Sequence, residues 1–150
     1  MRMKPAAIFH ASRTRVLAGL FSGLFAISAA IAATSPESID NTTKVDAEAF
    51  IELVDEIDDL IIIDSRIPGD RKQGYIEGSL SLPDVDTTCE SLAKVIPKMD
   101  SPSLFYCNGV KCGRSAEAIK IALSCGYNNI YWFRGGFEEW LHKGYPYLQQ

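Results

Sequence analysis

The segment Leu104-Phe-Tyr-Cys107-Asn-Gly-Val-Lys-Cys112-Gly-Arg114-Ser115-Ala116 decides the fold that the sequence predicts. Its apolar run, residues 104–106, is typical of a buried strand, and Gly109 and Gly113 let the chain turn tightly after it. A helix that follows this loop points its free N–H groups and the positive end of its dipole back at Cys107. The sequence therefore predicts an anion site at the end of a strand.

Cys107 is the candidate nucleophile of this site. Lys111 and Arg114 add positive charge to that of the helix end, and all of these groups favour a thiolate. We expect the pKa of the Cys107 thiol to fall from about 8.5 to roughly 3.5 to 7.5. A thiolate at that position is a ready nucleophile that needs no separate histidine base.

The first 32 residues predict an export signal. Four basic residues and no acidic residue precede a stretch, residues 16–33, that is apolar, small or hydroxylated, and Ala30-Ile31-Ala32 has the small-x-small pattern of a cleavage site. We expect an exported, periplasmic protein without stable membrane association after cleavage. The alternative is an uncleaved anchor formed by residues 16–33, because about 18 apolar residues can span a bilayer.

Charge and composition restrict the class of function. Loss of residues 1–32 would lower the net charge from −4 to −8, which makes nucleic acid a poor partner. The remaining residues suffice for one domain with a real core. All four cysteines lie in this part, so disulfides are possible after export. We expect neither a metal nor a cofactor, since Cys107 and Cys112 have an unhelpful spacing and no second ligand pair is evident.

Strand and helix signals alternate along the rest of the chain. Residues 33–43 are polar and predict a flexible lead-in, and Asp46 is a candidate helix cap. Strands are expected at residues 60–63, 104–106 and 130–133, and helices after Asp46, after Thr87, and at residues 115–124 and 137–143. This alternation predicts an α/β fold, a mostly parallel sheet with helices on both faces, with ligands at the carboxyl ends of the strands.

Several spaced motifs resemble the rhodanese (sulfurtransferase) domain family. They are Asp64-Ser65-Arg66, Gly74-Tyr75-Ile76-Glu77-Gly78-Ser79, Leu82-Pro83, the cysteine loop, and Arg134-Gly135-Gly136 before Trp140, Gly144 and Pro146. Their order predicts a rhodanese-like domain over residues 44–150. In this family the cysteine after the central strand takes a sulfane sulfur from thiosulfate or a related donor as a persulfide. It then passes the sulfur to a thiophilic acceptor, and the matching residue is Cys107.

The resemblance assigns roles to other residues. The loop after Cys107 is the expected cradle for the thiolate and for a small anionic sulfur donor, with a thiol or cyanide as acceptor. Its members are Asn108, Gly109, Val110, Lys111, Cys112, Gly113 and Arg114. Asp64 and Arg66 are expected to form a structural ion pair beside the loop, and Arg134 to serve the turn and a wall of the pocket.

Cys112 departs from the family pattern. An arginine followed by serine is usual five residues after the nucleophile, whereas here Cys112 holds that place and Arg114-Ser115 comes two residues later. One interpretation is that Cys112 resolves a persulfide or sulfenate on Cys107, which makes the pair a thiol-disulfide redox centre. Another is a plain loop thiol, or a disulfide that forms passively after export. For the protein as a whole, a further alternative is a non-catalytic rhodanese-like module that binds a partner. Phosphoryl chemistry is disfavoured, because Gly113 holds the place of the phosphatase arginine.

The other two cysteines carry no catalytic expectation. Cys89 falls on the apolar side of its predicted helix, and Cys125 lies at a helix end before Gly126. We expect both thiols to be buried and inert.

Overall fold

The computed structural model describes residues 34–149, so the predicted export signal at residues 1–32 lies outside the described part. The strands are β1 (Thr43–Val45), β2 (Ile61–Asp64), β3 (Leu80–Ser81), β4 (Ser103–Tyr106) and β5 (Ile130–Phe133). The helices are α1 (Ala47–Glu56), α2 (Pro68–Arg71), α3 (Cys89–Val95), α4 (Arg114–Ser124) and α5 (Gly136–His142), with a 3₁₀ turn, η1, at Asp84–Asp86. None of the helices among these residues is long and apolar enough to cross a membrane.

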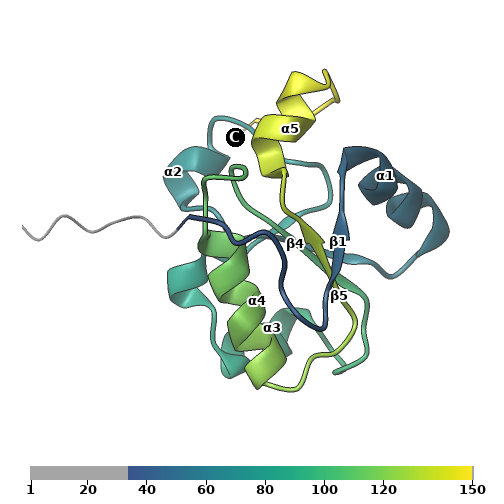
Figure 1. Ribbon diagram of the computed structural model, residues 1–150, viewed down its shortest axis with the longest axis vertical. Coiled ribbons are helices and arrows are strands. Elements are labelled where there is room, and N and C mark those ends of the chain that lie inside the picture. The colour runs from purple at the N-terminus through teal and green to yellow at the C-terminus, as the bar shows by residue number, and fades with distance from the viewer. Residues whose placement is uncertain (1–33, 150) are drawn as a thin grey trace, which may run out of the picture. The chain divides into compact units, whose positions relative to one another are not determined.

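The five strands form one parallel sheet in the order β1-β5-β4-β2-β3, with β4 at its centre (Figure 1). Parallel neighbours need crossover connections, and the helices between the strands supply them. The predicted α/β fold with a mostly parallel sheet is confirmed.

Successive residues of the central strands face opposite sides of the sheet, so each strand contributes to two cores. Phe105 packs with the residues of α3 and α4, whereas Leu104 and Tyr106 pack with Phe50 of α1 and Trp140 of α5. Helices α3 and α4 therefore cover one face and α1 and α5 the other (Figure 1). With both faces covered, the loops at the carboxyl ends of the strands are the place where a site can form.

Two helix starts follow local capping chemistry. The carboxylate of Asp46 accepts a hydrogen bond of 2.9 Å from the N–H of Ala49, which confirms the predicted cap of α1. The cap of α3 is Thr88, one residue later than expected, and its hydroxyl accepts from the N–H of Ser91. The N–H of Thr88 donates in return to the hydroxyl of Ser91 at 2.8 Å, which completes a capping box.

The polar segment before β1 contacts the folded domain. Arg134 donates to the carbonyl oxygen of Pro36 at 2.6 Å and to the carboxylate of Glu37 at 2.7 Å, and Ser35 is buried. We expected a flexible lead-in over residues 33–43 and did not predict this contact. Strand β1, which begins at Thr43 inside that segment, pairs with β5.

The prediction for Cys89 and Cys125 is wrong. The two residues form a disulfide with a Cα–Cα distance of 5.5 Å, and Cys89 is exposed rather than buried. The bond joins the start of α3 to the end of α4, which pack side by side over the same face of the sheet. Within the described residues, Cys107 and Cys112 are the free cysteines.

We predict that the Cys89–Cys125 bond stabilises the fold through its closed loop, whose ends are 36 residues apart. Replacing Cys89 with Ser should lower the free energy of unfolding by roughly 3 to 4 kcal/mol, measured by urea denaturation. Cys125→Ser should lose the same amount, and the double variant should lose no more than either single one. Losses that add in the double variant would contradict a contribution from the bond itself.

Candidate active site

Cys107 lies at the carboxyl end of the central strand. It follows β4 directly, is 1 % exposed, and begins a loop that leads into α4 at Arg114. The parallel neighbours of β4 end at the same edge of the sheet, so the segments after β2 and β5 surround this loop. The position is the one that the sequence predicted for the site.

Helix α5 holds the start of the loop in place. The N–H of Phe137 donates to the carbonyl oxygen of Cys107 at 2.9 Å, and the N–H of Glu138 donates to that of Asn108 at 2.7 Å. Gly136 makes this approach possible, because a Cβ atom there would collide with the Cys107 carbonyl oxygen and its φ of +59° is left-handed. The glycine pair after Arg134 therefore serves the active loop.

Ser115 contacts the sulfur of Cys107 from the first turn of α4. Its hydroxyl donates to the Cys107 sulfur at 3.3 Å and accepts a bond of 3.0 Å from the indole N–H of Trp132. Because the Ser115 oxygen accepts the indole N–H, its own proton is free to point at the Cys107 sulfur. The loop motif does not indicate this role of Ser115, although the serine directly follows Arg114.

The two free cysteines interact with each other. The Cys107 thiol donates to the carbonyl oxygen of Cys112 at 2.9 Å. Interaction with the Cys112 side chain, followed by burial and by the Cys112 charge, raises the pKa of Cys107 above the usual thiol value. The expected fall in the pKa of Cys107 is therefore wrong, because the partner sulfur outweighs the donors of Ser115.

Cys112 carries the negative charge of the pair. The interaction with Cys107 is the largest cause that lowers the pKa of Cys112, to about 5, and the N–H groups of Arg114 and Asn108 and the Arg114 charge act in the same direction. The Arg114 guanidinium also lies 3.8 Å from the Cys112 sulfur. The positive charge of this loop thus acts on the sulfur of Cys112, whereas the sequence analysis expected it to act on Cys107.

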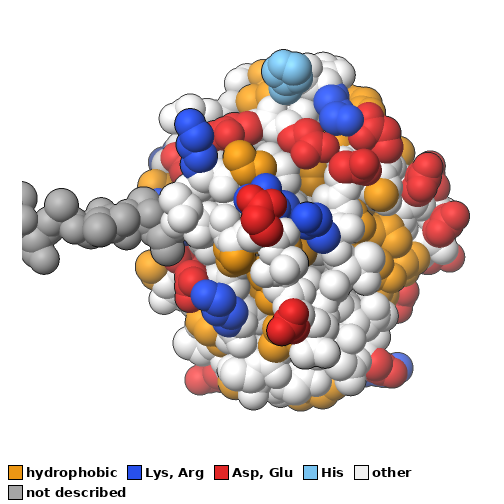
Figure 2. All heavy atoms as spheres, in the orientation of Figure 1, with side chains coloured by type: hydrophobic (Ala, Val, Ile, Leu, Met, Phe, Trp, Pro, Cys, Tyr) orange, Lys and Arg blue, Asp and Glu red, His pale blue; other side chains and the backbone are white. Residues whose placement is uncertain are grey.

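A pocket of about 470 Å³ opens beside the loop. Its lining residues are Asp84, Val85, Asn108, Lys111, Cys112, Gly113, Arg114, Glu117 and Glu138. Acidic and basic side chains are interspersed over the face of the molecule drawn in Figure 2. Cys112 lines this pocket and is partly exposed, whereas Cys107 lies behind it.

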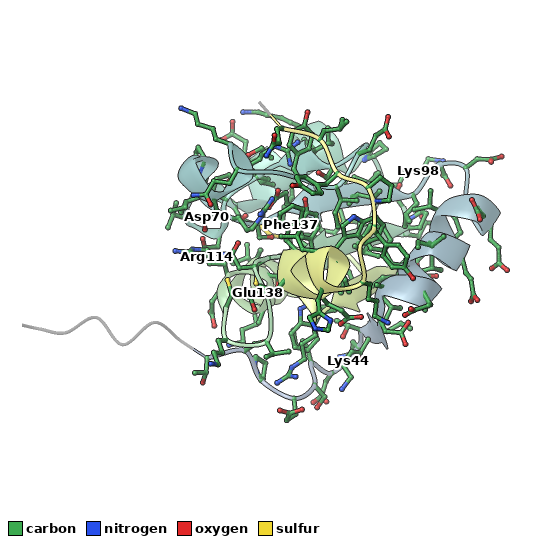
Figure 3. The ribbon with its side chains drawn as sticks, turned by 90° about the horizontal axis from the view of Figure 1, so that it is seen from above. Lys44, Asp70, Lys98, Arg114, Phe137 and Glu138 are labelled. Carbon is green, nitrogen blue, oxygen red and sulfur yellow. A yellow bond between two sulfur atoms is a disulfide. The ribbon has the colours of Figure 1, made fainter. Side chains whose placement is uncertain are left out.

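Acidic side chains offset the positive charge of Lys111 and Arg114 at the opening of the pocket. Arg114 lies 3.8 Å from the carboxylate of Asp70 and 3.6 Å from that of Asp84, and Glu138 is next to the loop at Gly109. Figure 3 shows Asp70, Arg114 and Glu138 on the same side of the molecule around the loop. These acids lie in other segments, so inspection of the loop motif alone does not reveal them.

A buried carboxylate supports the segments around the pocket. Asp64, at the end of β2, accepts from Arg66 at 2.7 Å, from Arg71 at 2.9 Å and from the hydroxyl of Tyr106 at 2.8 Å. Burial opposes the charge of Asp64, but the bonds and charge of Arg66 outweigh it and lower the pKa of this carboxyl. The expected Asp64–Arg66 ion pair is present, and Arg71 is a third member that the motif did not indicate.

This network continues to both walls of the loop. The guanidinium of Arg66 lies 4.3 Å from the ring centre of Phe137 in α5. Arg71 belongs to α2, where Asp70 accepts a bond of 2.8 Å from the side-chain amide of Asn108. The end of β2 thus positions the helices that contact the cysteine loop.

Two predicted site residues lie away from this pocket. Val110, at the tip of the loop, and Arg134 line a separate hollow beside β1. Arg134 is bound to the segment before β1. The expectation that Arg134 forms a wall of the cysteine pocket is therefore wrong. Among residues 34–149, no group of three or more His, Cys, Asp and Glu side chains is arranged to hold a metal ion.

Residues 46–143 match the rhodanese-like domain family. The chain belongs to this family. It is 28 % identical over 103 residues to a sulfurtransferase of Allochromatium vinosum, an alignment that covers 69 % of this chain and 92 % of the relative. It is 30 % identical over 96 residues to a rhodanese domain-containing protein of Drosophila melanogaster, covering 57 % of this chain and 85 % of that one.

Solved structures share the rhodanese fold. The polysulfide-sulfur transferase of Wolinella succinogenes superposes with a TM-score of 0.60 at 24 % identity, covering 73 % of this chain and 80 % of that one. The resemblance of the motifs to the rhodanese family is thus confirmed, and the chain is a sulfurtransferase-family protein.

We predict that one thiolate forms in the reduced loop at low pH. As the pH is raised, the thiolate absorbance of the wild type should increase with a midpoint at pH about 5. In Cys107→Ala the midpoint should move up, because the largest cause that lowers the pKa of Cys112 is lost. A wild-type midpoint at the usual thiol pKa of about 8.5 would contradict the lowered pKa of Cys112.

We also predict that Asp64→Asn destabilises the fold by about 3 to 5 kcal/mol, since it leaves two buried guanidinium groups without their carboxylate. The folded pKa of Asp64 is below its unfolded value, so its contribution is present at neutral pH and is lost as the pH falls through the folded pKa. Urea denaturation at several pH values measures both effects. Glu90→Gln, in an exposed pair with Lys94, is the matched control and should change stability little.

Proposed function

We propose that the protein is a rhodanese-type sulfurtransferase that carries a sulfane sulfur as a persulfide on Cys107. The observation that supports this proposal is the placement of Cys107 at the carboxyl end of β4, at the start of the loop that leads into α4, where the Ser115 hydroxyl donates to its sulfur at 3.3 Å. The Cys107 sulfur attacks the sulfane sulfur of the donor. A new S–S bond forms, and the donor leaves with its bonding electron pair, as sulfite where the donor is thiosulfate.

Cys112 supplies the base for this step. The resting pair holds one proton on Cys107 and one negative charge on Cys112, and the two side chains interact. Transfer of that proton to Cys112 makes Cys107 the thiolate. The vacated N–H groups of Asn108 and Arg114 then stabilise the outer sulfur anion of the persulfide. The sulfur leaves when a thiol or cyanide attacks it.

The donor is a small anion with a low charge. Lys111 and Arg114 attract it, but Asp84, Glu117 and Glu138 line the same pocket, so acids outnumber bases there. A singly charged hydropersulfide or polysulfide anion meets less repulsion in this pocket than a dianion such as thiosulfate.

The protein acts after export, in the periplasm. The Cys89–Cys125 disulfide supports this location, because such bonds persist in oxidising compartments.

We predict that the reduced protein gains one sulfur atom when it is incubated with thiosulfate or polysulfide and weighed intact. Cys107→Ser should gain none, because it lacks the nucleophile. Cys112→Ser loses the base, but it also loses the side chain and charge that raise the pKa of Cys107, so Cys107 can ionise without a base and should still gain the sulfur. Transfer of the added sulfur from the loaded protein to cyanide then tests turnover. A Cys112→Ser protein that takes no sulfur from either donor after full reduction of Cys107 would refute the proposal.

A second prediction concerns donor charge. Glu138→Gln should raise kcat/KM for thiosulfate by about threefold to tenfold, since one negative charge is removed from the mouth, and should change kcat/KM for a neutral donor less. Added salt should raise the wild-type value for thiosulfate by screening the repulsion. The control is Glu90→Gln, remote from the pocket. A wild-type kcat/KM that falls with salt would mean that the mouth attracts dianions.

A further inference from the structure

Cys112 lies between the buried nucleophile and solvent. Cys107 is 1 % exposed and does not line the 470 Å³ pocket, whereas Cys112 lines it and accepts a hydrogen bond of 2.9 Å from the Cys107 thiol through its carbonyl oxygen. The N–H of Cys112 donates to the carbonyl oxygen of Gly109 at 2.8 Å, which turns the loop back toward Cys107. A persulfide formed on Cys107 therefore has a second thiol beside it.

The remaining cysteines cannot serve as that partner. Cys89 and Cys125 are already joined to each other. Within the described residues, Cys112 is thus the thiol available to react with Cys107. The existing disulfide also indicates surroundings in which a further disulfide can persist.

We propose that Cys112 is a resolving thiol, which attacks the inner sulfur of the Cys107 persulfide and releases the transferred sulfur as hydrosulfide. This inference rests on the proposed function, because it requires a persulfide on Cys107. It adds an activity to that function, since a sulfane sulfur that meets no acceptor is reduced within the loop and leaves as sulfide.

The step is balanced in atoms and charge. After loading, the persulfide ends in a sulfur anion and Cys112 holds the proton that it took from Cys107. That proton passes to the outer sulfur, the Cys112 thiolate attacks the Cys107 sulfur, and the bond to the outer sulfur breaks. One Cys107–Cys112 bond forms and one hydrosulfide ion leaves. The two cysteines are oxidised by two electrons in total, and the donor's sulfur accepts both.

The oxidised loop needs a reductant before the next cycle. A dithiol of small size or at the surface of a partner protein can supply two electrons by thiol-disulfide exchange. It attacks first at the Cys112 sulfur, which is the one that faces the pocket. The protein then converts a sulfane sulfur and a dithiol into sulfide and a disulfide.

The test compares wild type with Cys112→Ser. Each reduced protein is loaded with polysulfide, freed of donor, and followed by intact mass and by an assay for free sulfide, without an acceptor. The wild type should lose its added sulfur at least about tenfold faster than the variant, because the attacking thiol is intramolecular. It should release one sulfide per protein and end two hydrogens lighter than the reduced form. Peptide mapping should place the new bond between Cys107 and Cys112.

The possible outcomes separate the two proposals. If both proteins load and keep the sulfur equally long, Cys112 is not a resolving thiol, whereas the persulfide on Cys107 stands. If the sulfur moves to Cys112 without release of sulfide, the resolving step is also wrong. If neither protein loads, the proposed function fails and this inference fails with it.

Discussion

The buried carboxylate of Asp64 is the interaction on which the surroundings of the site depend. It ends β2 beside Tyr106, the last residue of β4, and holds Arg66 and Arg71 through hydrogen bonds of 2.7 and 2.9 Å. One of these arginines packs on α5 and the other belongs to α2. Because both helices contact the cysteine loop, a single buried charge fixes the walls of the pocket relative to the end of the central strand.

The loop itself is organised around one negative charge and two sulfurs. Burial and the interaction between the side chains keep the proton on Cys107, and the open N–H groups and Arg114 keep the charge on Cys112. In the mechanism that we propose, the same donors stabilise the outer sulfur of a persulfide, so that Cys112 occupies the place of the product in the resting state. In that mechanism the second cysteine is a base during loading and a thiol within reach of the loaded sulfur.

Local patterns were sufficient to predict most of the fold. The cap at Asp46, the apolar run before Cys107 and the helix after Arg114 depend on neighbours in the sequence, and all of them are present. The spaced motifs also indicated the family, which the comparison with the rhodanese-like domain confirms. The Cys89–Cys125 bond was missed because it depends on how two helices pack.

The direction of the pKa shift at Cys107 was missed for a related reason. The sequence shows that two cysteines share a loop but not which sulfur lies deeper or which receives the free N–H groups. The central claim, that Cys107 carries sulfur in this loop, is tested most directly by a crystal structure of the protein soaked with polysulfide under acceptor-free conditions, using Cys112→Ser to prevent resolution. The account predicts one added sulfur bonded to Cys107 and surrounded by the N–H groups of Asn108 and Arg114. An unmodified Cys107 in crystals of fully reduced, soaked protein would contradict it.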